Sequence, residues 1–143
     1  MKIAISSDNH LDVNQVNVDQ ALAFQTKWLI DHQVDYYFYA GDLFNNFQET
    51  RDYFARLQSR LGSQAKVYYI AGNPDMLTHA PYSLVENLAD SAYHHDRFVA
   101  LPGTNWRVIG HNGRYAYSLS PLGDQPSKVV RWQKVYWPDS ASF

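Results

Sequence analysis

The chain has 143 residues, of which 45% are hydrophobic and 18% are charged, with no cysteine and a formal net charge of -2. This length fits one globular domain, and 11 tyrosines, 7 phenylalanines and 4 tryptophans supply ample apolar area for its core. The composition excludes intrinsic disorder, disulfide scaffolds and thiolate metal sites. Twelve basic against fourteen acidic residues leave no excess for nucleic-acid phosphates, so no nucleic-acid partner is expected.

The N-terminus runs from Met1-Lys2-Ile3-Ala4-Ile5 directly into Ser6-Ser7-Asp8, without the apolar stretch of a signal peptide. No apolar run approaches the roughly 20 residues that span a bilayer. We therefore expect a cytoplasmic protein that has no membrane partner.

Short β-like runs alternate with helical patterns along the first half of the chain. Strands are expected at residues 2–6, 35–40 and 66–71, and helices at about 17–33 and 48–61, the second ending at Gly62. The aromatic run Tyr36 to Tyr39 has no interleaved basic residues, so it fits a buried central strand better than a base-stacking platform. This alternation predicts an α/β fold with a mainly parallel sheet flanked by helices.

The patterns beyond residue 75 are weaker. A short helix is expected at 82–88, a hairpin with strands at 98–101 and 106–110, and a further strand at 115–119. The tail carries Trp132, Tyr136 and Trp137, which fit either core positions or an exposed apolar face.

Polar side chains follow each of the three predicted parallel strands. Asp8 and His10 follow the first, Gly41 and Asp42 the second, and Gly72-Asn73-Pro74-Asp75 the third. Because open α/β sheets place their sites at the carboxyl ends of strands, these residues should converge on one edge. In an extended Asp-x-His segment both side chains point to one side and could hold one ion. Oxygen ligands with one imidazole suit Mn, Fe, Zn or Ni.

These blocks resemble the signature of the calcineurin-like metallophosphoesterases, which reads D-x-H, G-D, G-N-H-[DE] and later G-H-x-H. The resemblance implies the first half of a four-layer sandwich and hydrolysis of an unspecified phosphoester by metal-activated water. It implies that Asp8 and His10 hold one metal, that Asp42 bridges two metals and that Asn73 ligates the second metal and touches phosphate. Divalent ions are the implied cofactors, Mn first, with Fe, Zn or Ni as alternatives.

The chain departs from this signature at two places. Pro74 replaces the histidine that serves the leaving group, and proline has no side-chain donor. No G-H-x-H follows Asn73, and the nearest match is Gly110-His111-Asn112-Gly113. We therefore expect residues 1–143 to form a single domain, truncated on its C-terminal side, with an incomplete site. The open sheet face of such a half-sandwich predicts either self-association into a homo-oligomer or a tendency to aggregate.

Two other interpretations of the chain remain open. One is a noncatalytic, degenerate relative that acts through self-association. A receiver-like Mg²⁺ domain is less favoured, because Asn9 stands where a second acidic residue is needed and no late lysine pattern occurs. The run His94-His95-Asp96 is expected to be an exposed loop without a ligand role, whereas the glycine-flanked His111 is a better candidate for a loop near the site.

Overall fold

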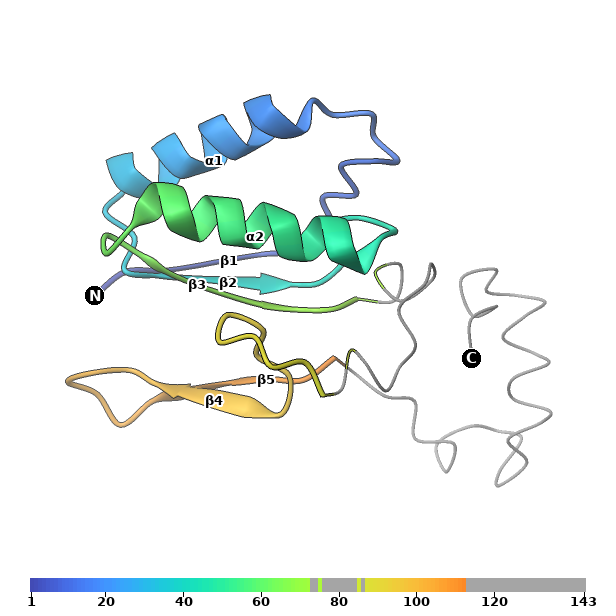
Figure 1. The fold of residues 1–143 in the computed structure, drawn as a ribbon. Coiled ribbons are helices and arrows are strands. Elements are labelled where there is room, and N and C mark those ends of the chain that lie inside the picture. Colours follow the sequence, from blue (N-terminus) through green and yellow to red (C-terminus); the bar gives the residue numbers. More distant parts are fainter. Residues whose placement is uncertain (73–74, 76–84, 86, 113–143) are drawn as a thin grey trace, which may run out of the picture.

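The computed structural model describes residues 1–72, 75, 85 and 87–112 of the chain (Figure 1). The expected ligand Asn73, its neighbour Pro74, most of the helix expected at 82–88, the strand expected at 115–119 and the C-terminal tail lie outside these residues.

The centre of the fold is a parallel sheet of three strands. They are β1 (Ile3–Ser6), β2 (Tyr36–Ala40) and β3 (Lys66–Ile70), in the order β1-β2-β3. The register places Phe38 opposite Ile5 on one side and opposite Tyr68 on the other. The side chains of Tyr36 to Tyr39 are all buried, which confirms the prediction of a buried central strand.

Two helices, α1 (Val18–Asp31) and α2 (Phe47–Leu61), cover one face of this sheet (Figure 1). The Asn17 side chain caps α1 by accepting a hydrogen bond from the Gln20 amide at 3.0 Å. Asn46 caps α2 through the Gln48 amide, also at 3.0 Å, and the helix ends at Gly62 with φ 57°. The predicted α/β fold with a mainly parallel sheet is confirmed, and these elements correspond to the first half of the expected sandwich.

Between the helices and the sheet lies the main apolar core. The Phe54 ring on α2 stacks on the Tyr69 ring of β3, with centroids 4.6 Å apart, and lies 5.1 Å from the Tyr39 ring. Leu22 and Leu57 are also fully buried in this cluster. This packing holds β2 and β3 in place beneath α2, and it thereby positions the residues that follow these strands.

A hairpin of β4 (Arg97–Ala100) and β5 (Arg107–Gly110) lies against the opposite face of the sheet (Figure 1). Val99 and Leu101 bury the side chains of Tyr36 and Phe38 there. The expectation that this face is open was therefore wrong for the centre of the sheet, because the hairpin supplies a second small core. Ile5, on the edge strand β1, is 70% exposed.

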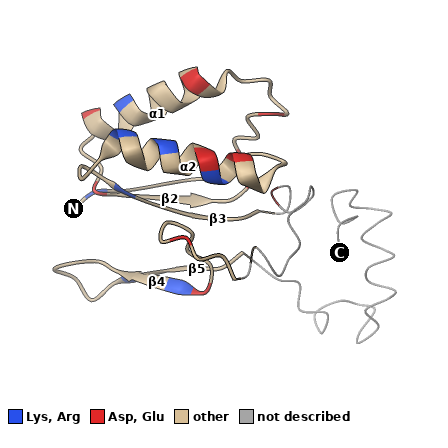
Figure 2. Cartoon of the chain, viewed as in Figure 1, with Lys and Arg blue, Asp and Glu red and all other residues tan. Residues whose placement is uncertain are grey.

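Acidic and basic residues are interspersed on the two helices (Figure 2), so no basic stripe runs along either of them. Within the described part of the chain, no helix is both long enough and apolar enough to cross a membrane.

Candidate metal site

Three of the four predicted ligands come together at the carboxyl edge of the sheet. Asp8 and His10 follow β1, and Asp42 follows β2. One ligand atom from each lies within 4.8 Å of the others. Asp8 is exposed, and His10 and Asp42 are partly exposed, so the group is accessible from solvent.

The loops after β1 and β2 continue to pair beyond the ends of the strands. The amides of Asp8 and His10 donate to the carbonyl oxygens of Gly41 and Asp42, both at 3.1 Å. The next pair, the Leu11 amide and the Leu43 carbonyl, is 2.9 Å apart. These hydrogen bonds hold the two ligand-bearing loops side by side.

The backbone at all three ligands is left-handed, with φ 59° at Asp8, 43° at His10 and 66° at Asp42. The sequence-based argument placed Asp8 and His10 on an extended segment, and that conformation was wrong. The side chains converge because of the left-handed residues and the paired loops. A non-glycine residue in this region costs about 1–2 kcal/mol, and such conformations cluster at functional sites.

Two glycines allow the ends of β2 and β3 to approach each other. A Cβ atom on Gly72 would lie 1.7 Å from Oδ1 of Asp42, and one on Gly41 would lie 2.7 Å from Cα of Gly72. Any side chain at Gly72 would therefore occupy the place of the Asp42 carboxylate.

Asp75 is fully buried directly behind these loops. Its Oδ2 accepts hydrogen bonds from the amides of Asp42 at 3.1 Å and Gly72 at 2.8 Å, and its Oδ1 accepts one from the Thr50 hydroxyl. Burial raises the pKa of the Asp75 carboxyl to about 6, although these hydrogen bonds act in the opposite direction. Sequence reasoning gave Asp75 no role beyond its place in the motif.

Thr50 was also missed, although the sequence carries a signal for it. Thr50 falls on the apolar stripe of α2, one turn before Tyr53 and Phe54, and its side chain is fully buried. A polar residue on a buried helix face needs a hydrogen-bond partner, and here the partner is Asp75.

The Tyr39 hydroxyl is hydrogen-bonded to the loops that follow β1 and β2. It accepts a hydrogen bond from the Asn9 amide at 3.1 Å and donates one to the Asp42 carbonyl at 3.4 Å. Burial holds the pKa of Tyr39 well above its usual value, so the hydroxyl remains a donor at neutral pH. The central residue of Asp-x-His is thereby tied to β2.

The histidines that precede β4 are not the exposed loop that was expected. His94 and His95 are 7% and 6% exposed, because their segment runs beside β3 and pairs with Tyr69 through Tyr93. Burial lowers the pKa of His94. The polar sequence around these histidines concealed their burial, which arises from contacts with a strand about 25 residues earlier.

The segment that follows β5 reaches the end of β3. Asn112 accepts a hydrogen bond from the Ala71 amide at 3.1 Å and donates one to the Tyr93 hydroxyl at 2.6 Å. The backbone amide of Asn112 also donates a hydrogen bond to Nδ1 of His95, at 3.2 Å. His111 therefore belongs to a segment that adjoins the site edge, with its Nε2 3.7 Å from Oδ1 of Asp96, but it is not part of the group of three ligands.

The donor set suits a divalent transition-metal ion. Two carboxylates and one imidazole match the preferences of Mn, Fe, Zn and Ni. Three protein ligands leave further coordination positions for water or substrate, as catalytic sites require. The described residues therefore fit the metal that the sequence motif implies.

Comparison with known proteins agrees with this geometry. The sequence matches the family model of the calcineurin-like phosphoesterases over residues 1–139. No curated protein and no solved structure matches the chain.

Proposed function

The chain belongs to the calcineurin-like phosphoesterase family, and we propose that it binds divalent metal at Asp8, His10, Asp42 and Asn73 and hydrolyses a phosphoester there. The observation that carries this proposal is the convergence of ligand atoms from Asp8, His10 and Asp42 within 4.8 Å. Three left-handed residues at one edge support it, because a fold retains such strain where the geometry is used.

The proposed roles are those that the sequence signature implies, and the described ligand atoms of Asp8, His10 and Asp42 lie close enough together for them. Asp8 and His10, on one loop, would hold one metal ion, and Asp42, on the neighbouring loop, would contribute its carboxylate to both ions. Asn73, after the third strand, adds an amide oxygen for the second position and for the phosphate. Bound divalent ions supply activation of water and neutralisation of phosphate charge. Mn²⁺ is the first choice, followed by Fe, Zn and Ni.

Pro74 limits the reaction that these residues support. The side chain at this position cannot protonate a leaving group, and loss of a general acid typically lowers a rate by about 10²–10⁴-fold. We therefore expect slow turnover, best for aryl phosphoesters whose leaving group needs no proton.

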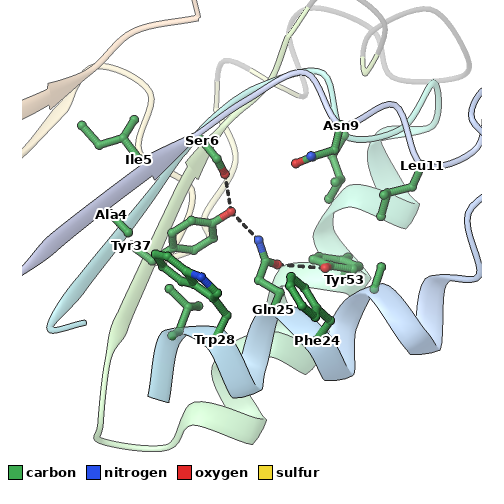
Figure 3. A pocket seen from close by; sticks show the side chains of 13 residues that line it. Ala4, Ile5, Ser6, Asn9, Leu11, Phe24, Gln25, Trp28, Tyr37 and Tyr53 are labelled. Carbon is green, nitrogen blue, oxygen red and sulfur yellow. Dashed lines mark hydrogen bonds between the residues drawn. The ribbon is translucent and has the colours of Figure 1, made fainter. Parts of the chain in front are cut away.

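A second candidate function is self-association by a noncatalytic relative. Two exposed apolar side chains favour it: Ile5 on the edge strand β1 is 70% exposed, and Phe24 on α1 is 72% exposed. A cavity of about 320 Å³ opens between β1 and α1, and Figure 3 shows the side chains that line it. Among them the Tyr37 hydroxyl is hydrogen-bonded to Ser6 and Gln25, and Gln25 is hydrogen-bonded to Tyr53. A homo-oligomer with no metal affinity would support this alternative.

Calorimetric titration of Mn²⁺ into the full chain tests the principal proposal. Wild type should bind, and Asp42→Asn should lose most of the affinity because a carboxylate ligand becomes a neutral amide. Asp31→Asn is the matched control, because Asp31 lies on α1 and forms an ion pair with Lys27. Equal binding by wild type and Asp42→Asn would reject the assigned site.

A further inference from the structure

Asp75 and Thr50 form a buried pair behind the candidate site, and we propose that this pair positions the Asp42 carboxylate for metal binding. The inference rests on the function proposed above and adds two positioning residues to it. Neither residue serves as a ligand in this account.

Both oxygens of Asp75 are already engaged by the protein. Oδ2 accepts hydrogen bonds from the backbone amides of Asp42 and Gly72, at 3.1 and 2.8 Å. Oδ1 accepts a hydrogen bond from the Thr50 hydroxyl. Asp75 and Thr50 are both 0% exposed. A carboxylate that accepts three hydrogen bonds from the protein and has no exposed surface stabilises the neighbouring backbone; it is not accessible as a ligand to an ion that enters from solvent.

The backbone conformation that Asp75 stabilises is that of Asp42. Its φ of 66° follows a φ of 88° at Gly41, so two consecutive residues are left-handed and the Asp42 amide lies outside any strand or helix pairing. Asp75 accepts a hydrogen bond from that amide and thereby offsets part of the free-energy cost of the left-handed conformation. Without this acceptor the partly buried amide loses the hydrogen bond, and the loop gains other conformations.

The same oxygen also fixes the distance between two strand ends. By accepting from Asp42 and Gly72 together, Oδ2 of Asp75 keeps Gly72 against the Asp42 carboxylate, where no Cβ fits. This contact restricts the directions in which the Asp42 carboxylate can turn.

Thr50 connects this arrangement to the rigid part of the fold. It lies on α2 one turn before Phe54, whose ring stacks on Tyr69 in the main core. The Thr50 hydroxyl therefore fixes Asp75 relative to α2 and, through Asp75, fixes the ligand loop. Side chains that orient metal ligands in this way typically contribute about 10–100-fold to metal affinity.

Three variants and a control test the proposal by Mn²⁺ calorimetry on the full chain. Thr50→Val keeps the shape of the side chain but removes the hydroxyl, Asp75→Asn removes the charge, and Thr50→Ser restores the hydroxyl. We expect Thr50→Val and Asp75→Asn to weaken Mn²⁺ binding by about 10-fold or more, with Thr50→Ser near wild type. Tyr53→Phe removes a hydroxyl from the same helix, one that bonds Gln25 away from the site, and should leave affinity unchanged.

Amide hydrogen exchange in metal-free protein provides the second readout. Thr50→Val should accelerate exchange at Asp42 and Gly72 by about 10-fold or more while the Phe54 amide keeps its protection. Absence of Mn²⁺ binding by wild type would reject the proposed function, and the exchange rates would then decide the positioning role. Unchanged exchange at Asp42 and Gly72, or unchanged affinity in a Thr50→Val protein whose parent binds Mn²⁺, overturns the inference.

Discussion

The ligand loops and the core beneath α2 are built in opposite ways. In the core, Phe54 and Tyr69 sit in regular elements, fully buried and stacked on each other. At the ligand loops, Asp8 is exposed, His10 and Asp42 are partly exposed, and all three have a left-handed backbone. The core gains stability from burial, while the loops hold two neighbouring carboxylates and a strained backbone. The difference indicates that stability and metal binding should respond separately to mutation.

The largest effect on stability is expected from a mutation in the core beneath α2. Phe54→Ala removes a fully buried ring between Tyr39 and Tyr69 and should lower the free energy of unfolding by about 3–5 kcal/mol. Urea denaturation measures the loss. A change below about 1 kcal/mol would show that the helix–sheet contact is not the principal core.

The pH dependence of stability should reveal Asp75, which lies between the two regions. Its pKa in the folded state, about 6, is above the usual 3.8, so the folded protein binds this proton more tightly than the unfolded chain does. Its contribution is therefore most favourable below about pH 4 and is lost as pH rises through about 6. The full loss is about 2–3 kcal/mol.

Urea titrations of wild type and Asp75→Asn between pH 4 and 7 measure this loss. The stability of wild type relative to Asp75→Asn should fall across that range, because the amide has no proton to lose. Parallel curves for the two proteins would contradict the raised pKa.

A methyl group at the site should damage function more than fold. Gly72→Ala places Cβ where Oδ1 of Asp42 lies, so the ligand must move. Overpacking of this kind costs about 1–3 kcal/mol, and Mn²⁺ affinity should fall with it. Gly62→Ala is a control for Mn²⁺ affinity alone: its Cβ meets no atom within 4 Å, so affinity should be unchanged, although the φ of 57° at that position strains alanine and lowers stability. Retained Mn²⁺ affinity in Gly72→Ala would show that the Asp42 carboxylate is not a ligand.

The smallest expected effect has the opposite sign. Asp8→Asn removes one of two neighbouring carboxylates and keeps a residue that tolerates a left-handed backbone. Metal-free protein should gain about 0.5 kcal/mol of stability from reduced repulsion, whereas Mn²⁺ binding should weaken. Thermal melts with and without Mn²⁺ check both changes. Lower metal-free stability in Asp8→Asn would contradict this account of the loop.

Local patterns in the sequence predicted the elements but not the contacts between distant segments. Tyr36 to Tyr39 were recognised as a buried strand because aromatic density and the following Gly41 are local signals. The burial of His95 was not recognised, since it depends on pairing with β3, and neither was the cover that Val99 provides for Phe38. Periodicity within one segment carries no information about which other segment packs on it.

The sequence pointed to Asp8, His10 and Asp42 as neighbours, but it did not reveal the backbone conformation that brings them together. The close approach of the ends of β2 and β3 at Gly41 and Gly72 was not predicted either, because it depends on contacts between distant segments. The left-handed backbone of Asp8 and His10 was not predicted, because a positive φ is uncommon at any non-glycine residue, although Asp and His adopt it more often than most. Such conformations persist only through loop pairing and the Tyr39 hydroxyl, which lie far away in sequence.

Paramagnetic broadening of amide NMR signals by Mn²⁺ tests the central claim most directly, because it locates the bound ion. Substoichiometric Mn²⁺ added to the full chain should broaden the amides of Asp8, His10, Asp42 and Gly72 first, and Asp42→Asn should abolish that pattern. Signals from the exposed end of α1 near Asp31 should stay sharp at the same concentration. Broadening centred on Asp96 and His111, or spread evenly over the exposed carboxylates of α1 and α2, would contradict a metal site at the ends of β1 and β2.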